Sequence, residues 1–127
     1  MYSDFVSFMA TIKINIAEVI GTGVCVATTD GQKVHDAIAV RLRAGDSVQI
    51  SFSGVTSIIT AFLNAAIGQL YGEFKEQEIV AKISMIDAKP DDLEKVNRVA
   101  AGAKLYFKDR EKFESVRRDV MGHGNDD

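Results

Sequence analysis

Two kinds of apolar pattern, one with a period of two and one with a helical period, follow each other along the chain. Ile12, Ile14 and Ile16 alternate with polar residues, which is typical of a half-buried strand. Four further apolar runs are short, and we expect each of them to form a strand. These runs are 24–27, 48–52, 79–86 and 103–107.

Apolar residues at spacings of three and four predict four helices between and after these strands. The first helix follows Thr29 or Asp30, either of which can accept hydrogen bonds from the first turn. Gly45 is expected to end it, because glycine tolerates positive φ. Thr60 is expected to cap the second helix. The four apolar stripes lie within 34–42, 63–74, 93–100 and 113–120.

The third predicted helix has a start signal of its own. Pro90 suits the first helical position, where its missing N–H is not needed. Asp91 and Asp92 place negative charge at the positive end of the helix dipole. We expect Gly102 to end this helix and Asp109 to cap the last one.

The predicted order of elements is β-β-α-β-α-β-α-β-α, which indicates an α/β fold. Strands that alternate with helices pair mostly in parallel, so we expect a mostly parallel or mixed five-stranded sheet with about four helices. A chain of 127 residues suits one domain. We place this domain at 12–120, after an N-terminal extension, 1–11, and before a disordered tail, 121–127.

Two stretches resemble the STAS domains, which are named for sulphate transporters and anti-sigma-factor antagonists. Residues 48–72, VQISFSGVTSIITAFLNAAIGQLYG, are similar to that family's central strand, Ser-x-Val loop and following helix. Residues 99–113, VAAGAKLYFKDREKF, are similar to its closing helix–Gly–strand–helix passage. The first stretch looks closest to the bacterial STAS-like domains of unknown function, often encoded beside a histidine-kinase-like ATPase. The resemblance covers about 12–118.

This resemblance implies a non-catalytic regulatory module that binds a histidine-kinase-like ATPase or an anti-sigma-type kinase. Regulated anti-sigma antagonists carry an Asp-Ser-Ser-Gly signature, and its second serine is phosphorylated. The matching residues here are Ile59, Thr60, Ala61 and Phe62, so alanine stands at the phosphoacceptor position. Thr60 is the remaining candidate for phosphorylation, and its alternative role is that of a plain helix cap. The resemblance also implies an alternative function, the sensing of a nucleotide or another small ligand.

No charged residue or histidine occurs from Ser47 to Gly72. Burial explains half of this, but a solvated helix face normally carries Lys and Glu. Because charge depletion is typical of interface cores, we expect the loop 53–60 and the outward face of the following helix to bind a partner. The alternatives are that another part of the chain covers this face, or that it self-associates in a homo-oligomer. The predicted partner-binding residues are Ser53, Ser57, Thr60, Phe62, Asn64, Ala65, Gly68, Gln69 and Gly72.

The segment Gly21-Thr22-Gly23 invites comparison with nucleotide-binding loops. It lacks the third glycine of a dinucleotide fingerprint and the Gly-Lys-Ser/Thr of a P-loop. A turn between two strands is therefore the favoured interpretation. If the chain senses a small ligand, we expect the rim of that site at Gly21, Thr22, Gly23 and Asp30.

Charge and composition argue against nucleic-acid binding, membrane contact, metal binding and catalysis. A formal net charge of −3 offers nothing that attracts nucleic acid. The N-terminus lacks the features of a secretory signal and the apolar stretch 55–67 is too short to span a bilayer, so we predict a cytoplasmic protein without membrane contact. Cys25, the one cysteine, is expected to be buried. His35 and His123 make no metal set or catalytic arrangement, so we expect no metal, no cofactor and no enzymatic activity.

Overall fold

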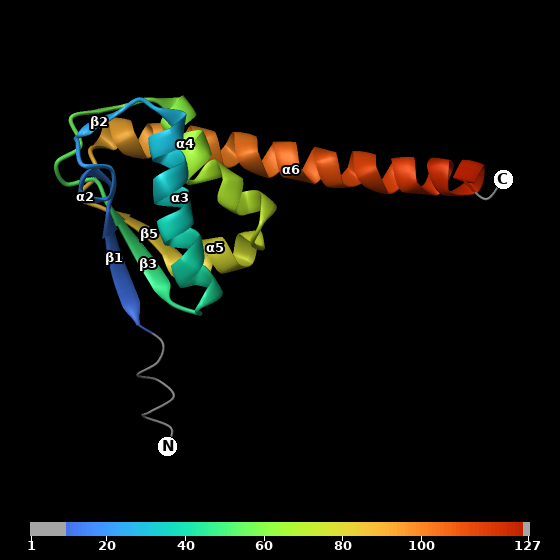
Figure 1. The fold of residues 1–127 in the computed structure, drawn as a ribbon, viewed down its shortest axis with the longest axis horizontal. Coiled ribbons are helices and arrows are strands. Elements are labelled where there is room, and N and C mark those ends of the chain that lie inside the picture. The colour runs from blue at the N-terminus through green and yellow to red at the C-terminus, as the bar shows by residue number, and fades with distance from the viewer. Residues whose placement is uncertain (1–9, 126–127) are drawn as a thin grey trace, which may run out of the picture.

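The computed structural model describes residues 10–125, and of residues 111–125 it describes the backbone alone. It confirms the α/β class, with parallel strands and helices in succession (Figure 1). The elements are β1 (Thr11–Asn15), α2 (Ile16–Ile20), β2 (Val24–Cys25), α3 (Thr28–Arg43), β3 (Ser47–Ser51), β4 (Ser57–Ile58), α4 (Thr60–Ala66), the 3₁₀ helix η1 (Gly68–Gly72), α5 (Glu76–Lys82), β5 (Ile83–Ile86) and α6 (Pro90–Asn125).

The main sheet has three parallel strands in the order β1-β3-β5. Because side chains alternate across a strand, its register gives the sheet one apolar and one polar face. The apolar face contributes to the core beneath α3, which contacts β1 and β3. Its two rows are Ile12–Val48–Ile83 and Ile14–Ile50–Met85, while Lys13, Gln49 and Ser84 form a row on the opposite face.

A single five-stranded sheet was expected, and in this respect the prediction is wrong. β2 and β4 form a separate two-stranded parallel sheet, which Figure 1 shows at the end of the body where α6 begins. Between β1 and β2 the chain forms the short helix α2, where a continuing strand through Ile16 was expected. The Asn15 side chain accepts the N–H of Glu18 at 2.9 Å and caps this helix, which ends at Gly21 with a φ of 79°.

The predicted strand at 103–107 is also wrong, because α6 continues through it. Nothing lies within 4 Å of a Cβ placed on Gly102, so this glycine marks no close approach or turn. Its neighbours include several alanines, lysine and leucine, which are strong helix formers and outweigh one glycine. Asp109 accordingly lies inside the helix and caps nothing.

The predicted strand at 79–86 is half correct. Residues 79–82 belong to α5, and only Ile83–Ile86 form β5. Acidic residues in the first turn of α5 and Lys82 in its last turn both complement the helix dipole. These charges favour a helix and override the β-branched pair of Ile79 and Val80.

Helix caps were predicted at three positions where the structure has none. α3 begins after Ala27 and α4 after Ile59, and neither helix has a side-chain cap. Thr29, Asp30 and Thr60 therefore lie inside the first turn. Gly45, with a φ of 89°, does follow the end of α3, and Pro90 begins α6 as expected.

The boundaries predicted for the domain differ at the C-terminal side. α6 extends to Asn125, so 121–125 is helical where a disordered tail was expected. Residues 126 and 127 lie outside the described part of the chain, as do residues 1–9 of the expected extension. None of the helices within residues 10–125 combines the length and the apolar character that a membrane-spanning segment needs.

Candidate functional site

Two loops without charged residues lie side by side at one end of the molecule. The first is 21–27 and the second is 53–61, and the pairing of β2 with β4 joins them. The carbonyl oxygen of Gly23 accepts the N–H groups of Thr56 and Ser57 at 2.8 and 3.2 Å. The N–H of Ile59 donates to the carbonyl of Cys25 at 3.1 Å. We call the exposed side of these two segments the paired-loop surface.

Alternation along β2 and β4 decides which side chains reach this surface. Cys25 and Ile58 point into the core and are almost fully buried. Their neighbours point outward, so Val24 and Val26 are each 48% exposed and Ile59 is 40% exposed. Three β-branched apolar side chains thus lie at the centre of the paired-loop surface. Exposed hydroxyl residues surround them, namely Thr22, Thr56, Ser57 and Thr60.

A polar network at the carboxyl ends of the main-sheet strands anchors the start of the second loop. The fully buried Ser51 accepts the N–H of Ser53 at 3.2 Å and donates to Asp87 Oδ2 at 2.8 Å. Asn15 Nδ2 donates to the carbonyl of Ser53 at 3.0 Å. Asp87 has a φ of 58°, a backbone conformation uncommon for a residue other than glycine.

The far end of the second loop is anchored by α6. Lys95 Nζ donates to the carbonyl of Ile58 at 2.9 Å. Both ends of the 53–61 segment are therefore held by side chains from elements outside it. A surface held in this way is preorganised, which lowers the entropy that a binding event has to overcome.

The predicted ligand rim is divided by the structure. Gly21, Thr22 and Gly23 border an open depression of about 430 Å³ together with Ser53 and Gly54. Thr22 Oγ1 accepts the N–H of Val24 at 3.1 Å, as expected of a turn. Asp30 does not line this depression, because it lies in the first turn of α3, where it pairs with Lys33 at 3.5 Å.

The outward helix face predicted to bind a partner is packed against the chain's own helices. Phe62 and Gly68 are buried, and Ala65 is partly buried. A Cβ on Gly31 of α3 would lie 2.6 Å from the carbonyl oxygen of Phe62 and 2.9 Å from Ala65 Cβ, so the two helices are in close contact. The expectation that this face is free is therefore wrong for Phe62, Ala65 and Gly68.

α6 also packs against part of that face. A Cβ on Gly68 would lie 3.3 Å from Val99 Cγ1, and one on Gly72 would overlap the ring of Phe107. Asn64 and Gln69 stay exposed at the border of a depression lined partly by α6. Small, neutral residues here permit close helix packing inside one chain. Of the residues predicted to bind a partner, Ser53, Ser57 and Thr60 remain exposed on the paired-loop surface.

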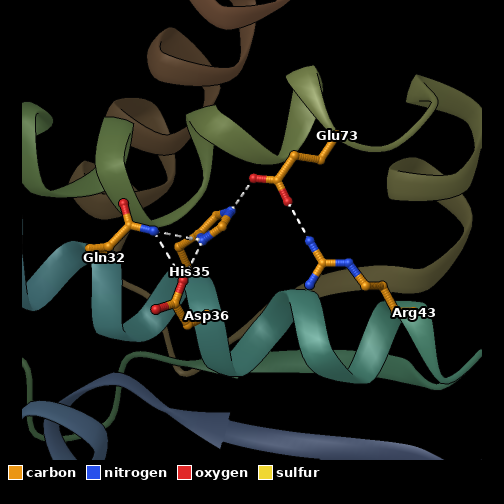
Figure 2. Close-up of polar contacts among 5 residues, drawn as sticks. All are labelled: Gln32, His35, Asp36, Arg43 and Glu73. Carbon is orange, nitrogen blue, oxygen red and sulfur yellow. Dashed lines mark hydrogen bonds and ion pairs between the residues drawn. The ribbon is translucent and has the colours of Figure 1, made fainter.

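Sequence reasoning did not identify a polar cluster around the buried His35 (Figure 2). His35 Nε2 lies 2.6 Å from Glu73 Oε1, and Glu73 Oε2 accepts from Arg43 at 2.8 Å. The Nδ1 atom lies 2.9 Å from Asp36 Oδ1 and 3.1 Å from Gln32 Nε2. A signal existed, since His35 precedes Ile38 and Leu42 by one and two helical turns, on their buried stripe.

Two titratable groups near the core have a pKa that burial raises. The pKa of the Cys25 thiol rises to about 11, mainly by burial and further by the negative charges of Asp30 and Asp92. Burial also raises the pKa of Tyr71. A thiol of this kind is a poor nucleophile at neutral pH. Within residues 10–110, no three His, Cys, Asp or Glu side chains are grouped so as to hold a metal ion.

A family model for a STAS-like domain of unknown function matches residues 30–93, half of the chain. The chain belongs to this family. The matched segment of the STAS-like domain runs from the first turn of α3 to that of α6, and it includes the whole 53–61 loop. No curated protein and no solved structure matches the chain.

Proposed function

We propose that this STAS-like domain is a non-catalytic regulatory module that binds a protein partner through the paired-loop surface. The observation that supports this most is the outward exposure of Val24, in the short sheet, and of Val26 and Ile59, directly after its two strands, in loops without charged residues. Apolar centres depleted of charge and surrounded by polar rims are typical of protein interfaces. The helix face first expected to dock the partner takes no part in this proposal.

The chemistry of the surface favours protein over nucleic acid as the occupant. Neither 21–27 nor 53–61 contains a lysine or arginine, and phosphate backbones are bound chiefly by such residues. Lys95 is engaged with the carbonyl of Ile58 beneath the loop. A partner would therefore be held by apolar contacts and hydroxyl hydrogen bonds, with little dependence on salt.

The resemblance of residues 48–72 and 99–113 to anti-sigma-factor antagonists favours a histidine-kinase-like ATPase or an anti-sigma-type kinase as the partner. The mechanism is competition or sequestration, in which the bound ATPase is withheld from its other partner. Fold alone does not determine function, so this choice of partner depends on analogy with the family. The cytoplasm, where such kinases act, is the compartment that this function requires.

If the partner is a kinase, Thr60 is the residue that it would phosphorylate. Thr60 is exposed and its side chain does not cap α4, so capping, its alternative role, does not occupy it. A phosphoryl group there would add about two negative charges to the neutral surface and would oppose apolar docking. Incubation with the ATPase and ATP followed by mass spectrometry tests this. A protein left without phosphate on residues 53–61 would contradict this part of the proposal.

The docking proposal is tested by placing charge at the centre of the surface. The binding partner in this test is the purified ATPase encoded by a gene next to that of this chain. Ile59→Asp and Val26→Asp should each raise its dissociation constant at least tenfold in calorimetry, because each substitution buries an unpaired carboxylate at the interface. Val80→Asp is the matched control, since Val80 is 67% exposed on α5, away from this surface. Equal affinity for all of these proteins would refute docking at this place.

A small-ligand sensor is the second candidate, favoured by the depression of about 430 Å³ beside Gly21 and Gly54. A ligand that binds only the folded protein raises its melting temperature. Thermal-shift screening with nucleotides and apolar compounds therefore separates this function from protein docking. Light scattering on the isolated chain tests the third alternative, a homo-oligomer.

A further inference from the structure

His35 on α3 is buried, and both of its ring nitrogens have polar partners (Figure 2). Nε2 faces Glu73, which directly follows η1 and so lies across the contact between α3 and η1. Nδ1 faces Asp36 and Gln32 on its own helix. Arg43 lies about two turns further along α3. It donates to the second carboxylate oxygen of Glu73, and its guanidinium lies over the ring of Phe74 at 5.7 Å.

A neutral imidazole has one N–H donor and one acceptor nitrogen, whereas an imidazolium has two donors. The carboxylate of Glu73 needs a donor, so Nε2 carries hydrogen in both forms. In the neutral form Nδ1 accepts from the amide of Gln32, which also donates to Asp36 Oδ1 at 3.0 Å. In the protonated form Nδ1 donates to Asp36, and the Gln32 contact is lost because two donors then face each other.

The charged groups around the ring include no excess of positive charge that would oppose its protonation. Asp36 and Arg43 approach from α3 and Glu73 from the segment after η1. α4 and η1 contribute no charged residue, since 47–72 contains none. Two carboxylates and one guanidinium leave one negative charge in the cluster, which an imidazolium would balance.

We propose that His35 is a proton-operated latch between α3 and the 68–82 segment that contains η1 and α5. A proton taken from solvent onto Nδ1 forms the bond to Asp36 and places a positive charge against Glu73. The Nε2–Glu73 contact, which is a hydrogen bond to a carboxylate in both forms, then becomes an ion pair, and opposite charges attract more strongly at a partly buried site than in water. The latch therefore tightens as the pH falls and the ring takes up the proton, and it loosens as the pH rises.

Ring protonation can be observed directly in the full chain. His123→Gln leaves His35 as the one histidine, because the sequence contains two. Nitrogen-15 spectra of the ring should show hydrogen on Nε2 alone at pH 8 and on both nitrogens at pH 5. Hydrogen on Nδ1 alone at pH 8, or the same protonation state of the ring at pH 5 and pH 8, would contradict the proposal.

Amide hydrogen exchange measures the tightness of the 68–82 segment. Protection factors there should fall on the order of tenfold between pH 5.5 and 7.5 in the wild type, after correction for intrinsic rates. His35→Gln should remove this dependence, and Glu73→Gln, on a partly exposed residue, should reduce it while the chain stays folded. Glu94→Gln on α6 is the control and should behave as wild type. The same pH dependence in all three variants would refute the proposal.

Discussion

The carbonyl oxygen of Gly23 accepts the N–H of Thr56 at 2.8 Å, and this bond joins two loops that are far apart in sequence. The approach is close enough that a Cβ on Gly23 would overlap the carbonyl oxygen of Gly54 and lie 3.2 Å from the nitrogen of Thr56. Glycine at position 23 is therefore a condition for the pairing of β2 with β4. That pairing in turn exposes Val24, Val26 and Ile59 together.

Gly23→Ala should separate the two loops. We expect a loss of about 1–3 kcal/mol in the free energy of unfolding, because the overlap involves backbone, which cannot rotate away. Partner binding should weaken as well. Urea denaturation and calorimetry measure the two effects.

Gly102→Ala is the control for that substitution. Its Cβ would meet nothing within 4 Å, and Gly102 is exposed inside α6, so alanine should stabilise the protein by about 0.5–1 kcal/mol. Equal effects of the two substitutions would show that contact with Gly54 is unimportant.

The parts of the fold that the sequence predicted correctly depend on local signals. Ile12 and Ile14, the helical stripe of Val34 and Ile38, and Pro90 at the start of α6 all lie where the pattern indicated. The errors arose where tertiary contact decides. A two-residue strand such as β4 has no period to detect, and its pairing with β2 depends on a long-range approach.

The candidate site shows the same limit. The neutral stretch 47–72 is visible in the sequence, but its neutrality has two different causes. Around Gly68 it reflects contact with α6, and around Ile59 it accompanies exposure to solvent. Sequence alone cannot separate the two, because α6 was expected to end at Gly102, before Phe107 could reach Gly72.

Gly68→Glu should unfold the protein, although on a free helix face it would only disturb binding. A side chain at this buried position would meet Asn64 Oδ1 and Val99 Cγ1, so the carboxylate would face an amide oxygen and an apolar group, and we expect a loss of more than about 4 kcal/mol in unfolding free energy. Gln69→Glu is the neighbouring control on an exposed residue and should change stability by less than about 0.5 kcal/mol. A folded, stable Gly68→Glu protein would restore the free-face interpretation.

Cys25 should resist thiol-specific reagents in the folded protein. With a pKa of about 11, it has a much smaller thiolate fraction at pH 8 than an ordinary thiol, and burial also blocks access. Labelling by a disulfide reagent should be at least ~100-fold slower than in denaturant. Val24→Cys in a Cys25→Ala background moves the thiol to an exposed position, and it should react quickly. Rapid labelling of native Cys25 would show that β2 opens readily.

Asp36 should contribute to the acid sensitivity of the fold. Two hydrogen bonds, the more important one from His35 and the other from Gln32, hold the pKa of the Asp36 carboxyl below its ordinary value of 3.8. A carboxyl whose pKa is lowered by folding stabilises the native state above its unfolded pKa, and this contribution is lost as the pH falls. Between about pH 5 and 2, the melting temperature of the wild type should therefore fall more than that of Asp36→Asn.

Salt provides the internal control for Asp36. Its side chain is 66% exposed, so the difference between the two melting curves should be small and should shrink at high ionic strength. Above pH 5 the wild type should be the more stable protein, because Asn at position 36 cannot offer a carboxylate to His35 and Gln32. If the two curves run parallel from pH 5 to 2 at low salt, the native contacts of Asp36 do not favour its charged form. The partner exchange inferred for His35 would then lack its acceptor on α3.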